Sequence, residues 1–212
     1  MDLTKLLLNP LSRQVVRDLA NPYDLHRSLL SAFPDAADGG PGRVLFRVEP
    51  RQTSDWYDDQ PPAPVVLLQS EQAPDWQKSG LHRDYFREQM PPKSLPEMFV
   101  ENTRLRFRLR ANPTVKRDGK RHGLFEEDAQ LKWLHRKAEE SGFQVVNVVV
   151  APEGNSLGTK LNGRRHDITH SAVKFDGELI VTNQILFAEA LKNGIGSAKG
   201  FGFGLLSIAR CD

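Results

Sequence analysis

A run of residues near the middle of the chain alternates between basic and apolar side chains. In residues 103–110 (TRLRFRLR), arginines occupy all four even-numbered positions, and Leu105, Phe107 and Leu109 occupy all but the first of the odd-numbered ones. Successive side chains of a β-strand point to opposite faces of the sheet. The run therefore predicts a strand with one face on a hydrophobic core and a cationic opposite face.

Around this strand, the order strand, helix, strand, strand is predicted twice. Near the start, the predicted elements are a strand at 3–8, a helix from the Asn21 cap to about 33, and strands at 44–48 and 65–68. The second set is the strand at 103–110, a helix at 126–141, strands at 143–150, 172–175 and 178–182, a helix at 186–191 and a strand at 205–209. The chain is therefore predicted to be α+β, with two split β-α-β units whose helices cover antiparallel sheets.

Three connections are also predicted. Asp176-Gly177 is a dipeptide typical of a two-residue hairpin turn. Residues 151–167 are interpreted as a basic, glycine-containing insertion, and a short helix is expected around 82–90.

Positive charge is concentrated beside the alternating strand. Residues 101–122 hold eight basic and two acidic residues, a local charge of +6 in a chain whose net charge is +2. Such a cluster favours a polyanion, nucleic acid above all, while the alternative is a solvated strand face. No acid is interleaved with the arginines, which favours the first interpretation. The basic residues are Arg104, Arg106, Arg108, Arg110, Lys116, Arg117, Lys120 and Arg121.

A glycine-rich loop runs from Gly194 to Gly204. Its spacing excludes a Walker loop, because Lys199 precedes a glycine, and a dinucleotide fingerprint, because only eight residues follow Gly204. The loop either lets an anionic ligand approach the backbone or simply makes a tight connection between a helix and a strand. Its candidate ligand-binding residues are Gly194, Gly196, Lys199, Gly200, Gly202 and Gly204.

His26 is the histidine with the most suggestive position. It follows Tyr23 by three residues on the predicted first helix, so both side chains lie on one helix face, with Arg27 adjacent. Imidazole titrates near neutrality and can move a proton in metal-free RNA scission. The alternative is a histidine packed among leucines. The spacing of His166 and His170 does not suit a metal in a strand or loop, and we expect neither metal nor cofactor.

Three blocks of the sequence carry a family resemblance. They are LTKLLLNPLSRQVVRDLANPYDLHRSL, LRFRLRANPTVKRDGKRHGL and GIGSAKGFGFGLLSI, in this order. Together they resemble the CasE family of CRISPR-associated endoribonucleases, the subtype I-E crRNA-processing branch of the RAMP superfamily. The resemblance implies two tandem ferredoxin-like domains at 1–97 and 98–212, with the catalytic helix in the first.

The resemblance also implies an activity and partners. The expected substrate is the stem-loop of a CRISPR repeat RNA, cut without metal by its 2′-hydroxyl at the 3′ base of the stem. Mature crRNA then stays bound, in a Cascade complex with other subunits. A non-catalytic RAMP-type RNA-binding subunit is the alternative. No apolar run reaches the length of a membrane span, and we expect a cytoplasmic protein.

The family's functional residues map onto particular positions of this sequence. The family's catalytic histidine matches His26, and its assisting tyrosine matches Tyr23. Its glycine-rich loop matches Gly194 to Gly204, and Arg27 is expected beside the scissile phosphate. A basic hairpin that the family inserts against the RNA corresponds to the segment that carries Lys160, Arg164 and Arg165.

Overall fold

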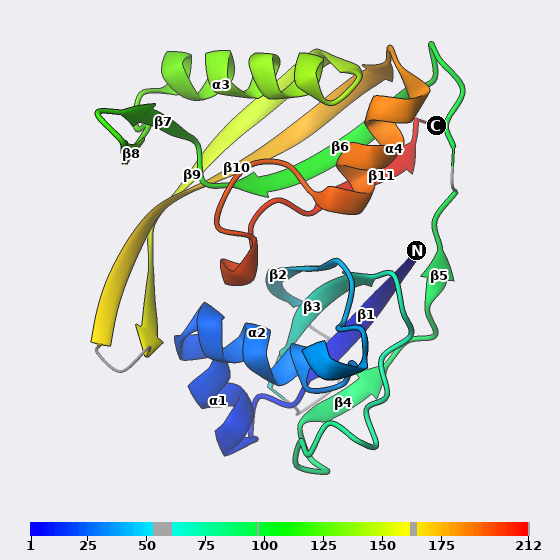
Figure 1. Ribbon diagram of the computed structural model, residues 1–212, viewed down its shortest axis with the longest axis vertical. Helices are drawn as coiled ribbons and strands as arrows, with labels where there is room; N and C mark the ends of the chain where they lie inside the picture. The colour runs from blue at the N-terminus through cyan, green and yellow to red at the C-terminus, as the bar shows by residue number, and fades with distance from the viewer. Residues whose placement is uncertain (53–60, 97, 162–164, 212) are drawn as a thin grey trace. The chain divides into compact units, whose positions relative to one another are not determined.

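The computed structural model describes residues 1–52, 61–96, 98–161 and 165–211 (Figure 1). The chain divides into two compact units. Unit 1 comprises Met1–Leu95 with Gly200–Gly202, and unit 2 comprises Pro96–Lys199 with Phe203–Asp212. Each unit is α+β and is built on an antiparallel sheet, as the sequence predicts.

The sheet of unit 1 has the strand order of a ferredoxin-like fold. Its main path runs β2-β3-β1-β4, and each neighbouring pair is antiparallel. A short fifth strand also pairs with β1. The strands are β1 (Asp2–Leu8), β2 (Val44–Gln52), β3 (Ala63–Ser70), β4 (Phe86–Gln89) and β5 (Lys93–Ser94).

Two consecutive helices and a coil complete unit 1. Helix α1 (Arg13–Ala20) was not predicted, and α2 (Pro22–Leu30) ends three residues before the expected stop. A 3-10 turn, η1 (Ala36–Asp38), precedes β2. The helix predicted around 82–90 is wrong: residues 86–89 form β4, and between β3 and β4 the chain contains only turns and irregular structure. Unit 1 therefore lacks the second helix of a complete ferredoxin-like domain.

Unit 2 has the same sheet order with both helices present. Its path runs β11-β6-β10-β9, again antiparallel throughout, and a separate two-stranded hairpin of β7 and β8 is inserted after β6 (Figure 1). Its elements are β6 (Arg104–Ala111), β7 (Thr114–Arg117), β8 (Lys120–Gly123), α3 (Glu127–Glu140), β9 (Phe143–Leu161), β10 (Arg165–Val181), α4 (Gln184–Asn193) and β11 (Leu206–Arg210). The glycine-rich loop contains a 3-10 turn, η2 (Lys199–Phe201).

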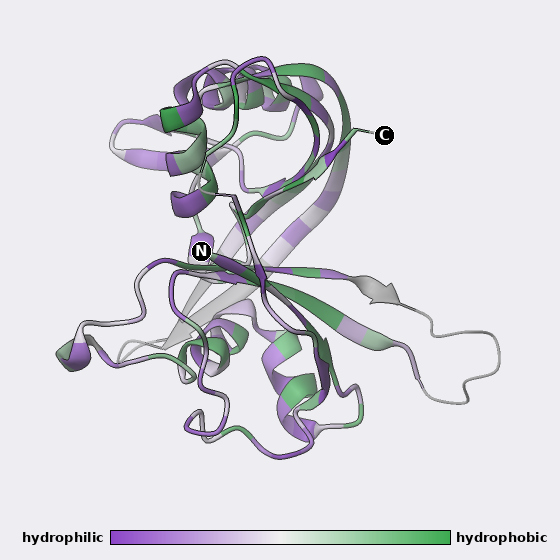
Figure 2. Ribbon diagram, turned by 90° about the vertical axis from the view of Figure 1, so that its right-hand side faces the viewer, coloured by the Kyte–Doolittle hydropathy of each residue, from purple (hydrophilic) through white to green (hydrophobic). Residues whose placement is uncertain are grey.

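Strand β6 confirms the alternation read from the sequence. Leu105, Phe107 and Leu109 are buried, whereas the arginines between them are exposed or partly exposed. The core beneath this face includes Phe107 and Phe143, whose ring centroids lie 6.3 Å apart, and Phe187. Figure 2 shows hydrophobic and hydrophilic residues interleaved along the helices and strands, as expected where each element buries only one face.

One predicted connection in unit 2 is wrong. Asp176-Gly177 makes no turn: it lies inside β10, where Gly177 pairs with Val148 of β9 and Phe107 of β6. The predicted basic insertion at 151–167 extends β9 and β10, over its described residues, as one long arm of two paired strands, which fits the hairpin that the family resemblance implies there. Pairing on both sides outweighs the turn preference of the Asp-Gly dipeptide.

Among the described residues, no helix is both long and apolar enough to cross a membrane.

Candidate functional site

Helix α2 begins with the cap that the sequence predicts. The Asn21 side chain accepts a hydrogen bond from the Tyr23 amide at 3.3 Å and donates one to the Asp24 carboxylate at 2.8 Å. Pro22 takes the first helical position, where its missing N–H costs nothing. Leu25 is 1% exposed in the core of unit 1, so the helix face that carries Tyr23 and His26 turns away from the deepest part of this core.

His26 lies between an aromatic ring and a glycine of the same unit. Its imidazole stacks on Phe46 of β2, with ring centroids 5.8 Å apart and planes at 21°. A Cβ placed on Gly200 would be 3.4 Å from both Cε1 and Nδ1 of the imidazole, so the backbone of η2 passes close to the ring. The side chain is half-buried. Within the part of the chain that the structure describes, neither ring nitrogen has a hydrogen-bond partner.

The second predicted catalytic residue lies one turn earlier on the helix. The Tyr23 ring meets Phe201 of η2, with centroids 5.8 Å apart and planes at 31°. Gly202 has φ +79°, and a Cβ on it would be 3.1 Å from Cε2 of Phe46. The glycines at 200 and 202 thus bring the loop backbone against the rings of His26 and Phe46, where a side chain at 202, or one larger than a methyl group at 200, would crowd them.

Burial changes the acid–base behaviour of His26. Removal from water disfavours the imidazolium and holds the pKa of His26 below its ordinary value. The imidazole is therefore predominantly neutral at neutral pH and can accept a proton. The neighbouring Arg27 is exposed, and its Nη1 lies 4.0 Å from the Asp24 carboxylate. An exposed pair at this distance leaves the guanidinium available to an anionic ligand.

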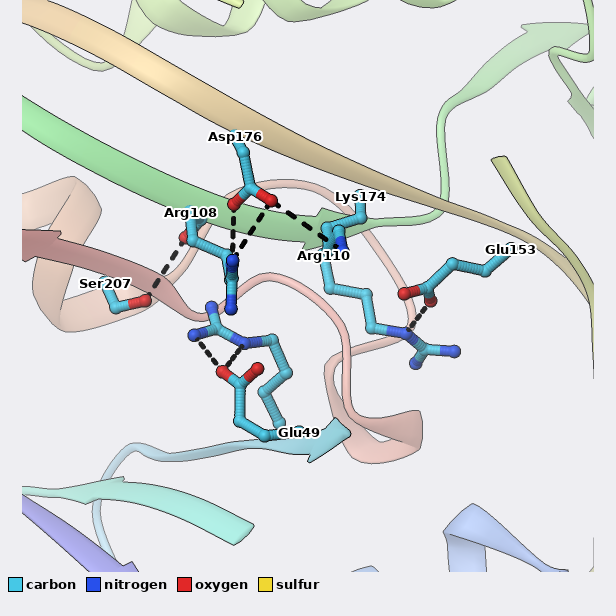
Figure 3. Close-up of polar contacts among 8 residues, drawn as sticks. Glu49, Arg108, Arg110, Glu153, Lys174, Asp176 and Ser207 are labelled. Atoms are coloured by element: carbon cyan, nitrogen blue, oxygen red, sulfur yellow. Dashed lines mark hydrogen bonds and ion pairs between the residues drawn. The ribbon is translucent and has the colours of Figure 1, made fainter. Parts of the chain in front are cut away.

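The arginine face of β6 differs from the prediction, because acids from the neighbouring strand β10 and its partner β9 neutralise it (Figure 3). Arg108 Nε lies 2.5 Å from Asp176 of β10, and Arg110 Nε lies 2.5 Å from Glu153 of β9. Arg104 binds Glu178 of β10, and Arg106 donates to the Arg210 carbonyl at 3.2 Å. These arginines therefore have acidic partners, contrary to the prediction, because the acids approach from other strands and not from β6 itself.

The rest of the predicted basic cluster forms the β7–β8 hairpin. Lys116, Arg117, Lys120 and Arg121 are all exposed, and the described residues include no acid within ion-pair distance of them. Of the predicted basic insertion, Lys160 lies in β9 and Arg165 in β10, while Arg164 falls outside the described residues.

The glycine-rich loop is closed at its base. The Ile195 amide donates to the Gly204 carbonyl, and the Gly204 amide donates to the Arg110 carbonyl, both at 2.8 Å. Gly194, Gly196 and Lys199 belong to unit 2, whereas Gly200 and Gly202 belong to unit 1. The loop therefore supplies the backbone beside His26 and also contributes to the other unit.

Two features of the site were missed from the sequence. Phe46 supports the imidazole, yet in sequence it resembles any other core residue of a strand. Asp18 of α1 is fully buried and accepts hydrogen bonds from Ser28 of α2 at 2.5 Å and Tyr85 at 3.0 Å, which ties α1 to the helix that carries His26. Only the three-dimensional packing brings these residues together.

No group of three or more His, Cys, Asp or Glu residues that could hold a metal ion occurs among the residues the structure describes.

Comparisons with known proteins agree with this architecture. A family model described as CRISPR associated protein matches residues 1–210. CRISPR-associated endoribonuclease Cse3 of Thermus thermophilus is 39% identical over 99% of this chain and 100% of its own length. CRISPR system Cascade subunit CasE of Escherichia coli is 29% identical over 99% of both chains. A structure of Thermus thermophilus Cse3, bound to an RNA that represents a pre-cleavage complex, matches with a TM-score of 0.82 and 38% identity over 98% of both chains.

These matches span nearly the whole chain. The chain belongs to the family of CRISPR-associated proteins and is homologous to the CRISPR-associated endoribonuclease Cse3 and to the Cascade subunit CasE.

Proposed function

We propose that this protein is a metal-independent endoribonuclease that cleaves precursor CRISPR RNA at the 3′ base of the repeat stem-loop and keeps the mature crRNA bound. The Thermus thermophilus relative, which is named a CRISPR-associated endoribonuclease and has a matching structure in complex with RNA, supports the substrate class. The name of the Escherichia coli relative supports assembly with other Cascade subunits. In this proposal, residues 1–97 form the catalytic domain and residues 98–212 a domain that binds RNA.

One observation carries the catalytic assignment. The His26 imidazole is held in place by Phe46 and by the backbone at Gly200, yet no described residue uses its ring nitrogens. Both ring nitrogens are therefore left to solvent or to a ligand. A fixed, neutral imidazole with an open nitrogen suits proton abstraction.

The chemistry follows from this protonation state. His26 accepts the proton of the ribose 2′-hydroxyl, and the 2′-oxygen forms a bond to the adjacent phosphorus. The bond between phosphorus and the 5′-oxygen then breaks, and the leaving oxygen takes a proton from the Tyr23 hydroxyl or from water. The products are a 2′,3′-cyclic phosphate and a 5′-hydroxyl.

Arg27 supplies the positive charge in this mechanism. Its exposed guanidinium follows His26 directly on α2 and can stabilise the negative charge that develops on the phosphorane. The glycine-rich loop beside the imidazole lets the sugar–phosphate backbone approach without a clash with side chains.

The test compares His26→Ala with the wild type on a labelled repeat RNA in excess EDTA. General acid–base catalysis contributes roughly 10²- to 10⁴-fold, so single-turnover cleavage should fall by about this factor while the RNA Kd changes little. Wild-type product with a 2′,3′-cyclic phosphate end is expected, and a 2′-deoxy nucleotide before the cut should abolish it.

His135→Ala is the matched control, because His135 is exposed on α3 and outside the site. It should cleave at the wild-type rate. If the wild type binds the RNA but leaves it intact, the protein is a non-catalytic RNA-binding subunit. If His26→Ala cleaves normally, His26 has no part in the reaction.

A further inference from the structure

A groove in unit 2 is lined by none of the residues assigned to cleavage. It has a volume of about 890 Å³ and lies among three elements: the β7–β8 hairpin, the last turns of α3 and the first part of the glycine-rich loop. Its lining includes five basic side chains and one acidic one, namely Lys116, Arg121, Arg136, Lys137, Lys199 and Glu140.

Among the described residues that line the groove, the single acid is already engaged. Glu140 Oε1 lies 2.7 Å from Arg136 Nη1, and Glu140 Oε2 lies 2.5 Å from Lys137 Nζ. One carboxylate shared between two cations leaves both of them undercompensated. The groove therefore carries a net positive charge that is not balanced by its own lining.

The hairpin above the groove places like charges opposite each other. In the β7–β8 register, Lys116 pairs with Arg121, and Arg117 pairs with Lys120. Like charges directly opposite on neighbouring strands destabilise a hairpin. No described acid relieves this repulsion, so a bound anion would stabilise the hairpin as well as the complex.

The size and lining of the groove indicate which anion it takes. A space of 890 Å³ lies in the range of ligand pockets and holds a few nucleotides of one strand. Trp133 is the only aromatic residue among its lining, and this ring is 4% exposed. A Cβ on Gly196 would lie 3.1 Å from Trp133 Cζ2, so the loop backbone covers the ring. The groove thus offers cations for phosphates and no stacking platform for bases.

We propose that this groove binds the phosphate backbone of a single-stranded RNA segment that flanks the repeat stem, independently of its base sequence. The proposal rests on the proposed function, because it assumes that the ligand of the protein is a stem-loop RNA with single-stranded flanks. The groove contributes affinity for the flank and takes no part in the chemistry at His26.

The test neutralises one of the two cross-strand pairs at a time. Lys116→Gln with Arg121→Gln removes two charges from the groove lining, whereas Arg117→Gln with Lys120→Gln removes two charges from the same hairpin outside it. Both double variants relieve one like-charge pair and change the net charge equally. Kd is measured between 50 and 300 mM salt for two RNAs: a repeat stem-loop with single-stranded flanks, and the same stem-loop without flanks. Both RNAs carry a 2′-deoxy nucleotide before the cut, so that they are bound but not cleaved.

The groove variant should bind the flanked RNA about tenfold more weakly at low salt. Its log–log salt dependence should be shallower by about 0.7 for each lost phosphate contact. Its Kd for the stem-loop without flanks should change less than about threefold, whereas the control variant should weaken the binding of both RNAs by the same factor. The proposal would be overturned if both variants lost the same affinity for the flanked RNA, or if the groove variant lost the same affinity for both RNAs. It would also be overturned if the groove variant lost no affinity, a result that a groove for an acidic protein would give.

The proposed function is judged separately in the same samples. Single-turnover cleavage of unmodified RNA at saturating protein should be unchanged in the groove variant. Failure of the wild type to cleave would overturn the endoribonuclease assignment, whereas the Kd comparison would still decide the groove.

Discussion

Gly177 offers a sharp test of how β9, β10 and β6 are assembled. It occupies the central strand β10, and its φ lies outside the left-handed region, so alanine is compatible with its backbone conformation. A Cβ at this position would lie 2.1 Å from the Asn147 carbonyl oxygen and 2.8 Å from the Val148 Cα. Both atoms belong to the backbone of β9, which cannot move aside like the end of a flexible side chain.

The overlap sets the expected cost of Gly177→Ala. Relief requires β9 to move by about 1 Å at a point where it is paired with β10, which weakens two or so ladder hydrogen bonds of about 1 kcal/mol each. Overpacking adds about 1 to 3 kcal/mol. We expect the free energy of unfolding to fall by about 3 kcal/mol, a large part of the stability of a domain.

Urea denaturation followed by far-UV circular dichroism measures this loss. Gly200→Ala is the matched control, since its φ is also compatible with alanine and its Cβ would make only ordinary contact, at 3.4 Å, with the His26 ring. Its stability should stay within about 0.5 kcal/mol of the wild type. A Gly177→Ala protein as stable as this control would refute the proposed assembly of β10 between β9 and β6.

Three further predictions concern titration and buried charge. If His26 is the base, the cleavage rate should be constant at neutral pH and fall tenfold per pH unit below the lowered pKa of His26; a rate that instead increases on acidification would contradict a base. Burial, together with the charge of Arg110, lowers the pKa of His170. As pH falls, the unfolded state therefore binds a proton on this residue before the folded state does, so the free energy of unfolding should decrease below about pH 6.5. Urea titrations should show a smaller decrease for His170→Gln. Asp18→Asn should lower the free energy of unfolding by about 2 to 3 kcal/mol, because Ser28 and Tyr85 then lose a charged hydrogen-bond acceptor. A loss below about 0.5 kcal/mol in urea denaturation would show that this hydrogen-bond network stabilises the fold little.

Local patterns predicted the elements that depend on local physics. The strict alternation in β6, the Asn21 cap of α2 and the glycine stop after α3 all appear at the expected positions. Period-two burial and cap hydrogen bonds involve neighbours within a few residues, so the sequence alone contains this information.

Features that depend on residues far apart in the sequence could not be predicted from local patterns. The acids opposite the β6 arginines lie on β9 and β10, and their proximity depends on strand register, which no local motif specifies. The turn preference of Asp176-Gly177 gave way to pairing on both sides of β10. For the site, the family resemblance selected Tyr23 and His26, while the ring of Phe46 beneath the imidazole emerged only from packing.

The coil that replaces the second helix of unit 1 has a dynamic consequence. Residues 71–85 cover the core with Trp76, Leu81 and Tyr85, and few backbone hydrogen bonds support them. A helix would unfold cooperatively. This segment is instead held by a few separate side-chain contacts, so each contact can open independently of the others. Amide protons here should exchange with deuterium long before those of β1 and β3, which would make this stretch the first part of the domain to open under mild denaturant.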